Sequence, residues 1–139
     1  RGPEKTGPSE TEQVLVKLIR VLANMAIHPE VGPSIAQSKL CADALLAILE
    51  RWSLTESEEL VLNVVGAITN LTFYEDSCNE VMALRSQVPR HITPLLVSDN
   101  VEAVVEASRA FGNFSRHPEV REYMAGTRVD EAISLLLDH

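Results

Sequence analysis

The chain has 139 residues, of which 45% are hydrophobic and only 4% aromatic, and its formal net charge is -8. The acidic balance repels nucleic-acid phosphates and anionic lipids, and no apolar run approaches the roughly 20 residues that span a bilayer. We therefore expect a soluble, intracellular, cytoplasmic protein that binds neither nucleic acid nor membrane.

The apolar residues are mainly Leu, Val, Ala and Ile, a set that favours interlocking helices. Residues 1–10 hold two Gly and two Pro without an apolar period, so we interpret them as a flexible linker or a cloning remnant. Ser9 and Glu12 then have the spacing of a capping box. Prolines and capping residues divide the rest into expected helices at 11–27, 29–38 with a kink at Gly32-Pro33, 40–52, 57–73, 76–87, 89–97, 100–116, 118–126 and 128–138.

Three segments of the chain align with one another without gaps: LIRVLANMAIHPEV, VVGAITNLTFYEDS and ASRAFGNFSRHPEV. Their asparagines, Asn24, Asn70 and Asn113, are 46 and 43 residues apart, a spacing typical of stacked helical repeats. The repeat predicts one array over residues 11–139, with repeat cores at 11–52, 56–97 and 100–139. Because the first residue is Arg1, we expect this array to be a fragment of a longer one.

The apolar positions repeat at nine, six and two residues before each asparagine and one after it. On a helix these positions share one face, which we predict is buried against neighbouring helices. The twelve residues are Leu15, Leu18, Leu22, Met25, Val61, Val64, Ile68, Leu71, Val104, Ala107, Phe111 and Phe114.

A second stripe contains the positions seven and four before the asparagine, the asparagine itself and the position four after it. It is mostly polar, and in a stack of helices it forms a ladder along one surface, which is our candidate partner-binding face. Its residues are Lys17, Arg20, Asn24, His28, Asn63, Gly66, Asn70, Tyr74, Glu106, Arg109, Asn113 and His117.

The motifs VLANM, AITNL and AFGNF resemble the last helix of the armadillo repeat over residues 11–139. The resemblance implies an all-α, right-handed armadillo-type solenoid of about three repeats. It also implies that the third helices line a groove, in which Asn24, Asn70 and Asn113 bind the main chain of an extended partner peptide. Import receptors of this family carry tryptophan four residues before the asparagine, whereas this chain has Arg20, Gly66 and Arg109. The arginines favour an acidic or polar partner segment.

Two alternatives to peptide binding remain. The asparagines can instead hydrogen-bond the backbone of adjacent repeats and stiffen the array. The chain can also be a structural unit that self-associates or docks through its array ends, where apolar surface is expected to be exposed.

We expect a non-enzymatic scaffold or adaptor without a cofactor. No nucleophile beside a base, paired carboxylates or phosphate-binding loop is apparent, and His28, His117, Cys41 and Cys78 lack metal-ligand spacing. The glycosylation triplets at Asn70 and Asn113 coincide with the repeat position, which explains them without secretion. The sequence also resembles armadillo proteins of cilia and sperm flagella, and this resemblance implies a role in axoneme assembly or transport.

Overall fold

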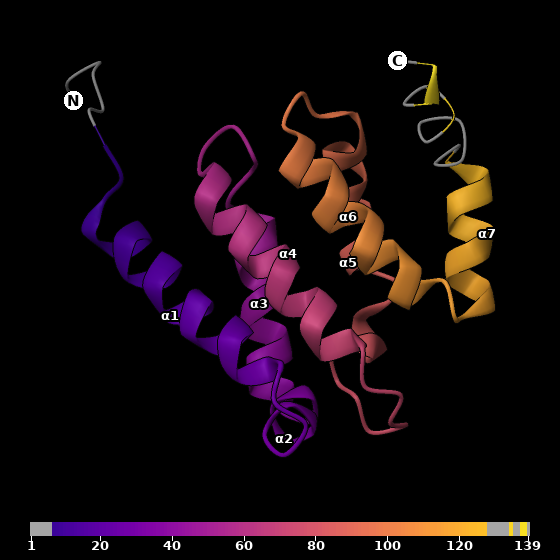
Figure 1. Cartoon of the computed structure of the whole chain (residues 1–139), viewed down its shortest axis with the longest axis horizontal. Coiled ribbons are helices and arrows are strands. Elements are labelled where there is room, and N and C mark those ends of the chain that lie inside the picture. The colour runs from indigo at the N-terminus through magenta and orange to yellow at the C-terminus, as the bar shows by residue number, and fades with distance from the viewer. Residues whose placement is uncertain (1–6, 128–133, 135–136, 139) are drawn as a thin grey trace.

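The computed structural model describes residues 7–127, 134, 137 and 138, and within them the regular elements are helical (Figure 1). The elements are α1 (Glu10–Ala26), α2 (Gly32–Ala36), α3 (Lys39–Arg51), α4 (Glu58–Thr72), η1 (Met82–Leu84), α5 (Val88–Ile92), η2 (Thr93–Val97), α6 (Val101–Phe114) and α7 (Pro118–Gly126). The 3-10 helices η1 and η2 are one or two turns long.

The three helices that carry the repeated asparagines are α1, α4 and α6, and we call them the ladder helices. They lie side by side in chain order, with α4 in contact with both α1 and α6 (Figure 1). The shorter helices α3 and α5 contact each other and pack behind the ladder helices. The repeats therefore stack in one direction, with each ladder helix contacting its neighbours along the array.

Polar caps set the start of several helices. The side chains of Ser9, Ser38 and Asn100 each accept a hydrogen bond from a backbone N–H in the first turn of α1, α3 and α6. Such caps satisfy N–H groups that have no partner inside the helix. Glu12 does not complete the expected capping box, because its carboxylate accepts a hydrogen bond from the Ser57 hydroxyl instead.

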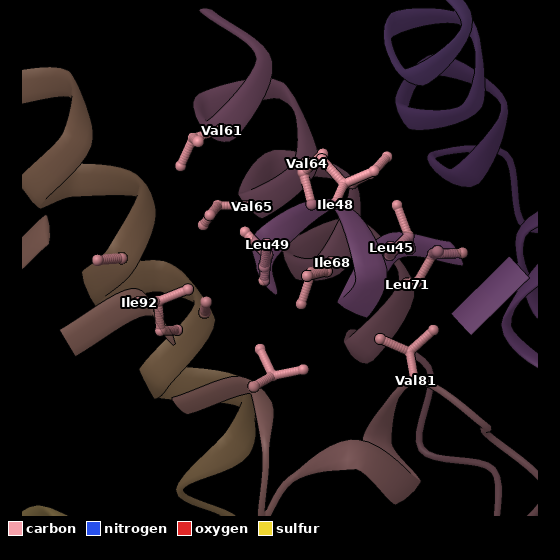
Figure 2. Packing of buried hydrophobic residues seen from close by; sticks show 14 of the residues in the cluster. Leu45, Ile48, Leu49, Val61, Val64, Val65, Ile68, Leu71, Val81 and Ile92 are labelled. Carbon is pink, nitrogen blue, oxygen red and sulfur yellow. The ribbon is translucent and has the colours of Figure 1, made fainter. Parts of the chain in front are cut away.

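The core runs through the array, with α4 at its centre (Figure 2). Val64, Val65, Ile68 and Leu71 of α4 are all fully buried. In Figure 2, Val64, Ile68 and Leu71 lie near Leu45, Ile48 and Leu49 of α3. Because α4 is covered from three directions, its sequence ELVLNVVGAITNL is apolar around most of its circumference.

The predicted helix at 76–87 is wrong: this segment is built of turns, and only η1 is helical. Asn79 explains the difference, because its buried side chain accepts hydrogen bonds from the N–H groups of Val81 and Met82. It also donates to the carbonyls of Leu71 and Tyr74. An asparagine that binds local backbone in this way competes with helix formation.

Smaller differences concern the proline sites. Gly32-Pro33 begins α2 and does not kink a longer helix, and the helix expected at 89–97 is divided into α5 and η2, with Pro94 in the first turn of η2. The helix predicted at 128–138 falls almost entirely outside the described residues.

The predicted buried stripe is correct for α4 and α6, where Val104 is the one half-buried member and the others are buried. It is wrong for part of α1, since Leu18 and Met25 are 59% and 43% exposed. The reason is positional, because among the described elements α1 lies at the edge of the array and has a ladder helix on one side only (Figure 1).

Candidate protein interface on the ladder helices

The asparagines of α4 and α6 make the same hydrogen bond to the preceding ladder helix. Asn70 Nδ2 donates to the carbonyl of Ala23 at 3.0 Å, and Asn113 Nδ2 donates to the carbonyl of Thr69 at 2.9 Å. Each acceptor is the residue just before the previous ladder asparagine. The structure thus joins the repeats through these side chains, as the stiffening alternative requires.

Other side chains of α4 and of the segments after α4 and α6 also donate hydrogen bonds to backbone carbonyls of the preceding ladder helix. Asn63 donates to the carbonyl of Val16 at 3.4 Å, and the Tyr74 hydroxyl donates to the carbonyl of Ala26 at 2.6 Å. In the next repeat Arg116 donates to the carbonyl of Thr72 at 2.7 Å. The carbonyls of Ala26 and Thr72 belong to the last turns of α1 and α4, where backbone acceptors have no partner inside the helix.

The two arginines of the predicted binding face are both ion-paired. Arg20 lies 2.6 Å from Glu59, and Arg109 lies 3.3 Å from Glu106. Both arginine side chains are more than half exposed, so the ion pairs are weak, but they reduce the positive charge that an acidic partner would meet. The charges along this face are therefore more balanced than the two arginines alone indicate.

The remaining predicted residues differ in their surroundings. Lys17 and Asn24 of α1 are exposed, and neither side chain bonds to another described residue. His117 is half-buried at the N-cap of α7, and its carbonyl accepts from the N–H of Val120. The structure thus brings Asn70, Tyr74, Arg109 and Asn113 to one place and leaves the residues of α1 apart.

That place is a hollow of about 430 Å³ between the C-terminal halves of the ladder helices. Phe73 is 67% exposed there, and its ring packs edge-on against Tyr74 with 5.5 Å between centroids. The hollow is lined by Ala26, Ile27, Thr69, Asn70, Phe73, Tyr74, Arg109 and Asn113.

Sequence reasoning missed Phe73 and Ile27, which are exposed apolar residues of the lining of this hollow. Phe73 is three residues after the ladder asparagine, outside both predicted stripes. An aromatic residue that falls off the buried stripe of an otherwise well-patterned helix is the signal that would have identified it.

A second hollow, of about 600 Å³, lies away from the asparagines, between the loop after α3 and the α5–η2 segment. Trp52 lines it, and the Arg51 guanidinium stacks over the indole at 4.6 Å from the ring centroid. Trp52 is half-buried and packs against the core, as expected for a packing residue.

The described residues offer few other candidate sites for thiol reactivity or metal binding. Burial raises the pKa of the Cys41 thiol, whereas Cys78 is exposed, and neither cysteine is in a disulfide. Among the residues that the structure describes, no three His, Cys, Asp or Glu side chains are grouped as metal ligands. Within the same part of the chain, no helix is both long and apolar enough to cross a membrane.

Stacked helices with the same asparagine hydrogen bond at both junctions between the ladder helices form an all-helical repeat that is consistent with an armadillo-type fold. Sequence comparison with known proteins supports this fold class. The chain is 39% identical over 136 residues to armadillo repeat-containing protein 2 of Bos taurus, covering 98% of the chain and 16% of that protein. It is 40% identical over 131 residues to the Homo sapiens protein of the same name, covering 94% of the chain and 15% of that protein.

The Mus musculus protein of that name is 42% identical over 130 residues, again 94% of this chain and 15% of the relative. The chain thus spans about a sixth of the length of these curated relatives. No family model matches the chain. No solved structure matches it significantly.

Proposed function

We propose that this chain is a non-enzymatic protein-interaction scaffold that binds an extended peptide segment along the ladder helices. The observation that carries this proposal is the hollow between α1, α4 and α6, in which the exposed ring of Phe73 lies beside two ladder asparagines. An exposed aromatic in a concave site is a typical anchor for a partner side chain. Armadillo relatives over nearly the whole chain support a scaffold role.

The hydrogen bonds within the array leave the asparagines able to bind a peptide as well. Asn70 and Asn113 use Nδ2 to reach the preceding helix, so each Oδ1 can still accept an N–H from an extended chain. Arg109 lines the same hollow but is paired with Glu106. We therefore expect a partner segment that supplies an apolar side chain to Phe73, with a carboxylate near Arg109 as a secondary feature.

Selection of peptides from a displayed random library, followed by fluorescence polarisation, tests this proposal. Phe73→Ala should weaken a selected peptide at least about tenfold, because it removes the anchor. Leu40→Ala is the matched control, since Leu40 is 83% exposed on α3 and does not line the hollow. Peptides whose affinity is the same for wild type and Phe73→Ala would contradict binding at this hollow.

The cellular role that we propose is in the assembly or transport of axonemal parts in cilia or sperm flagella. Its basis is the resemblance of the sequence to armadillo repeat-containing protein 2. A tagged chain expressed in ciliated cells should concentrate at the cilium or its base. A uniform cytoplasmic distribution, equal to that of the tag alone, would contradict this role.

A second candidate function is a structural unit that docks through its array end. The observation that favours it is the apolar face of α1, where four large aliphatic side chains are exposed. This candidate does not use the hollow around Phe73, so the two functions respond to different substitutions.

A further inference from the structure

The loop between α4 and η1 carries an exposed serine. Ser77 lies in a turn of this loop, which extends beyond the end of α4 (Figure 1), and its side chain hydrogen-bonds to no described residue. The loop is held on both sides of the serine. Before it, Asp76 Oδ2 accepts a hydrogen bond from Gln37 Nε2 at 3.1 Å. After it, the N–H of Glu80 donates to the carbonyl of Ala36 at 2.7 Å. The Ser77 hydroxyl is therefore presented to solvent on an anchored loop.

Carboxylates surround Ser77 in the sequence. Glu75 and Asp76 precede it directly and are exposed, and Glu80, three residues after it, is half-buried. Serine/threonine kinases with a basic substrate-binding surface select serines by such carboxylates, above all by one three residues after the hydroxyl. The local charge therefore favours this acid-directed class of kinase over kinases that bind basic segments.

The same spacing of hydroxyl and carboxylate occurs elsewhere in the chain, but each of those hydroxyls is hydrogen-bonded. They belong to Ser9, Ser53, Thr55, Thr72 and Thr127. Thr72 is also fully buried. Ser77 differs from all of them, because no described residue engages its hydroxyl.

Ser77 lines a hollow that it shares with two side chains of the next repeat. This hollow of about 380 Å³ lies between the loop and the segment that joins α6 to α7, from which Arg116 and His117 line it. Arg116 uses Nη2 for the carbonyl of Thr72, so Nε and Nη1 can donate to another acceptor. Unlike the ion-paired arginines of the chain, Arg116 has no carboxylate partner among the described residues.

We propose that Ser77 is a phosphorylation site for an acid-directed serine/threonine kinase, and that its phosphate binds Arg116 and His117 across the hollow. In the modification, the Ser77 oxygen forms a bond to the γ-phosphorus of ATP, the bond from that phosphorus to the bridging β-phosphate oxygen breaks, and ADP leaves. The hydroxyl proton passes to a carboxylate base of the kinase. This site goes beyond peptide binding at the hollow around Phe73 and does not depend on it.

The charges around the hollow decide where the phosphate lies. Glu75 and Asp76 line the same hollow and repel the phosphate, although both carboxylate oxygens of Asp76 already accept hydrogen bonds. On the other side, Glu119 at the start of α7 is paired with Arg85. Arg116 is permanently charged, and its planar guanidinium can donate two parallel hydrogen bonds to a phosphate. The phosphate should therefore turn toward Arg116 and join the second repeat to the third.

Incubation of the full chain with a purified acid-directed kinase and Mg-ATP, followed by tandem mass spectrometry, tests the site. Ser77 should carry the phosphate, Ser77→Ala should remove it, and Glu80→Gln should slow its incorporation at least about fivefold. Ser53→Ala is the matched control, since Ser53 has the same spacing to a carboxylate but a bonded hydroxyl, and its rate should equal that of wild type. An unmodified Ser77, under conditions in which the kinase fully modifies an unstructured acidic peptide, would overturn the proposal.

Phosphorus-31 NMR of the phosphorylated chain tests the contact across the hollow. A cation beside the phosphate favours the dianion, so the second pKa of the phosphate should lie below its ordinary value of about 6. Arg116→Gln keeps an N–H donor for the Thr72 carbonyl but removes the charge, so this pKa should rise to about 6 or above. Arg121→Gln should leave it as in wild type. Arg121 is the matched control, because it also donates to a backbone carbonyl, that of Ser115, but does not line the hollow.

Histidine side chains titrate near neutral pH, so the titration is repeated in chains that also carry His117→Gln. The difference in phosphate pKa between Arg116 and Arg116→Gln should persist in this background. A phosphate pKa that is equal in wild type and Arg116→Gln would overturn the contact with Arg116. Circular dichroism of the unphosphorylated variants at the wild-type level confirms that each result reports on the phosphate and not on unfolding.

Discussion

At the scale of single residues, the junction between the first two repeats depends on a glycine. A Cβ atom on Gly32 would overlap the ring and hydroxyl of Tyr74, whose hydroxyl donates to the carbonyls of Ala26 and His28. Gly32→Ala must therefore push Tyr74 away and break these bonds, at a cost of about 1–3 kcal/mol in the free energy of unfolding. Urea unfolding followed by circular dichroism measures this cost.

Gly66→Ala is the control for this substitution. Gly66 lies in the middle of α4, and an added Cβ would meet only a Glu106 oxygen at 3.8 Å, an ordinary contact. Since glycine is a poor residue in a helix interior, this change should stabilise the chain by roughly 0.5–1 kcal/mol. Equal effects of the two substitutions would show that Tyr74 does not occupy the space beside Gly32.

The two cysteines should differ in reactivity. Burial raises the pKa of Cys41, so at a given pH less of its thiol is in the reactive thiolate form, and its half-buried position limits access further. At pH 8 iodoacetamide should modify the exposed Cys78 several times faster than Cys41. Mass spectrometry of Cys41→Ser and Cys78→Ser variants separates the two rates, and faster labelling of Cys41 would argue against its burial.

At the scale of helices, the asparagine ladder should contribute to stability only where a preceding ladder helix is present. Asn70→Ala and Asn113→Ala each remove a side chain that bonds the neighbouring backbone, so each should cost about 0.5–1.5 kcal/mol. Asn24→Ala should change stability by less than about 0.5 kcal/mol in the monomer. Urea midpoints at low protein concentration compare the three, and equal losses would contradict this account.

The sequence predicted the ladder helices well because three aligned copies carry the same apolar spacing and the same asparagine. It did not predict how much of α1 is exposed, since Leu18 and Val64 look alike in the repeat and differ only in what lies beside them. It also failed for residues 76–87, where the decisive hydrogen bonds come from the side chain of Asn79. Asn70, Tyr74, Arg109 and Asn113 were placed on one stripe by the sequence and line one hollow, and their binding of a partner stays a prediction. Phe73 was not identified, because periodicity alone does not indicate an aromatic outside the stripe.

At the scale of the whole molecule, stability should depend on the central helix more than on the ends. α4 contacts both α1 and α6, so a loss in α4 affects the junctions on both of its sides. Ile68 is fully buried near Leu45 and Leu49 of α3 (Figure 2). Ile68→Ala should therefore lower the free energy of unfolding by about 2–5 kcal/mol.

Hydrogen exchange shows how far that loss spreads along the array. Ile68→Ala should speed exchange in α1, α4 and α6 together, because opening the centre uncouples both junctions. Leu18→Ala is the matched comparison, since its side chain is 59% exposed and its loss should leave exchange in α4 and α6 unchanged. If Ile68→Ala accelerates exchange in α4 alone, then α1 and α6 are stable without their central neighbour, and the array does not depend on stacking between ladder helices.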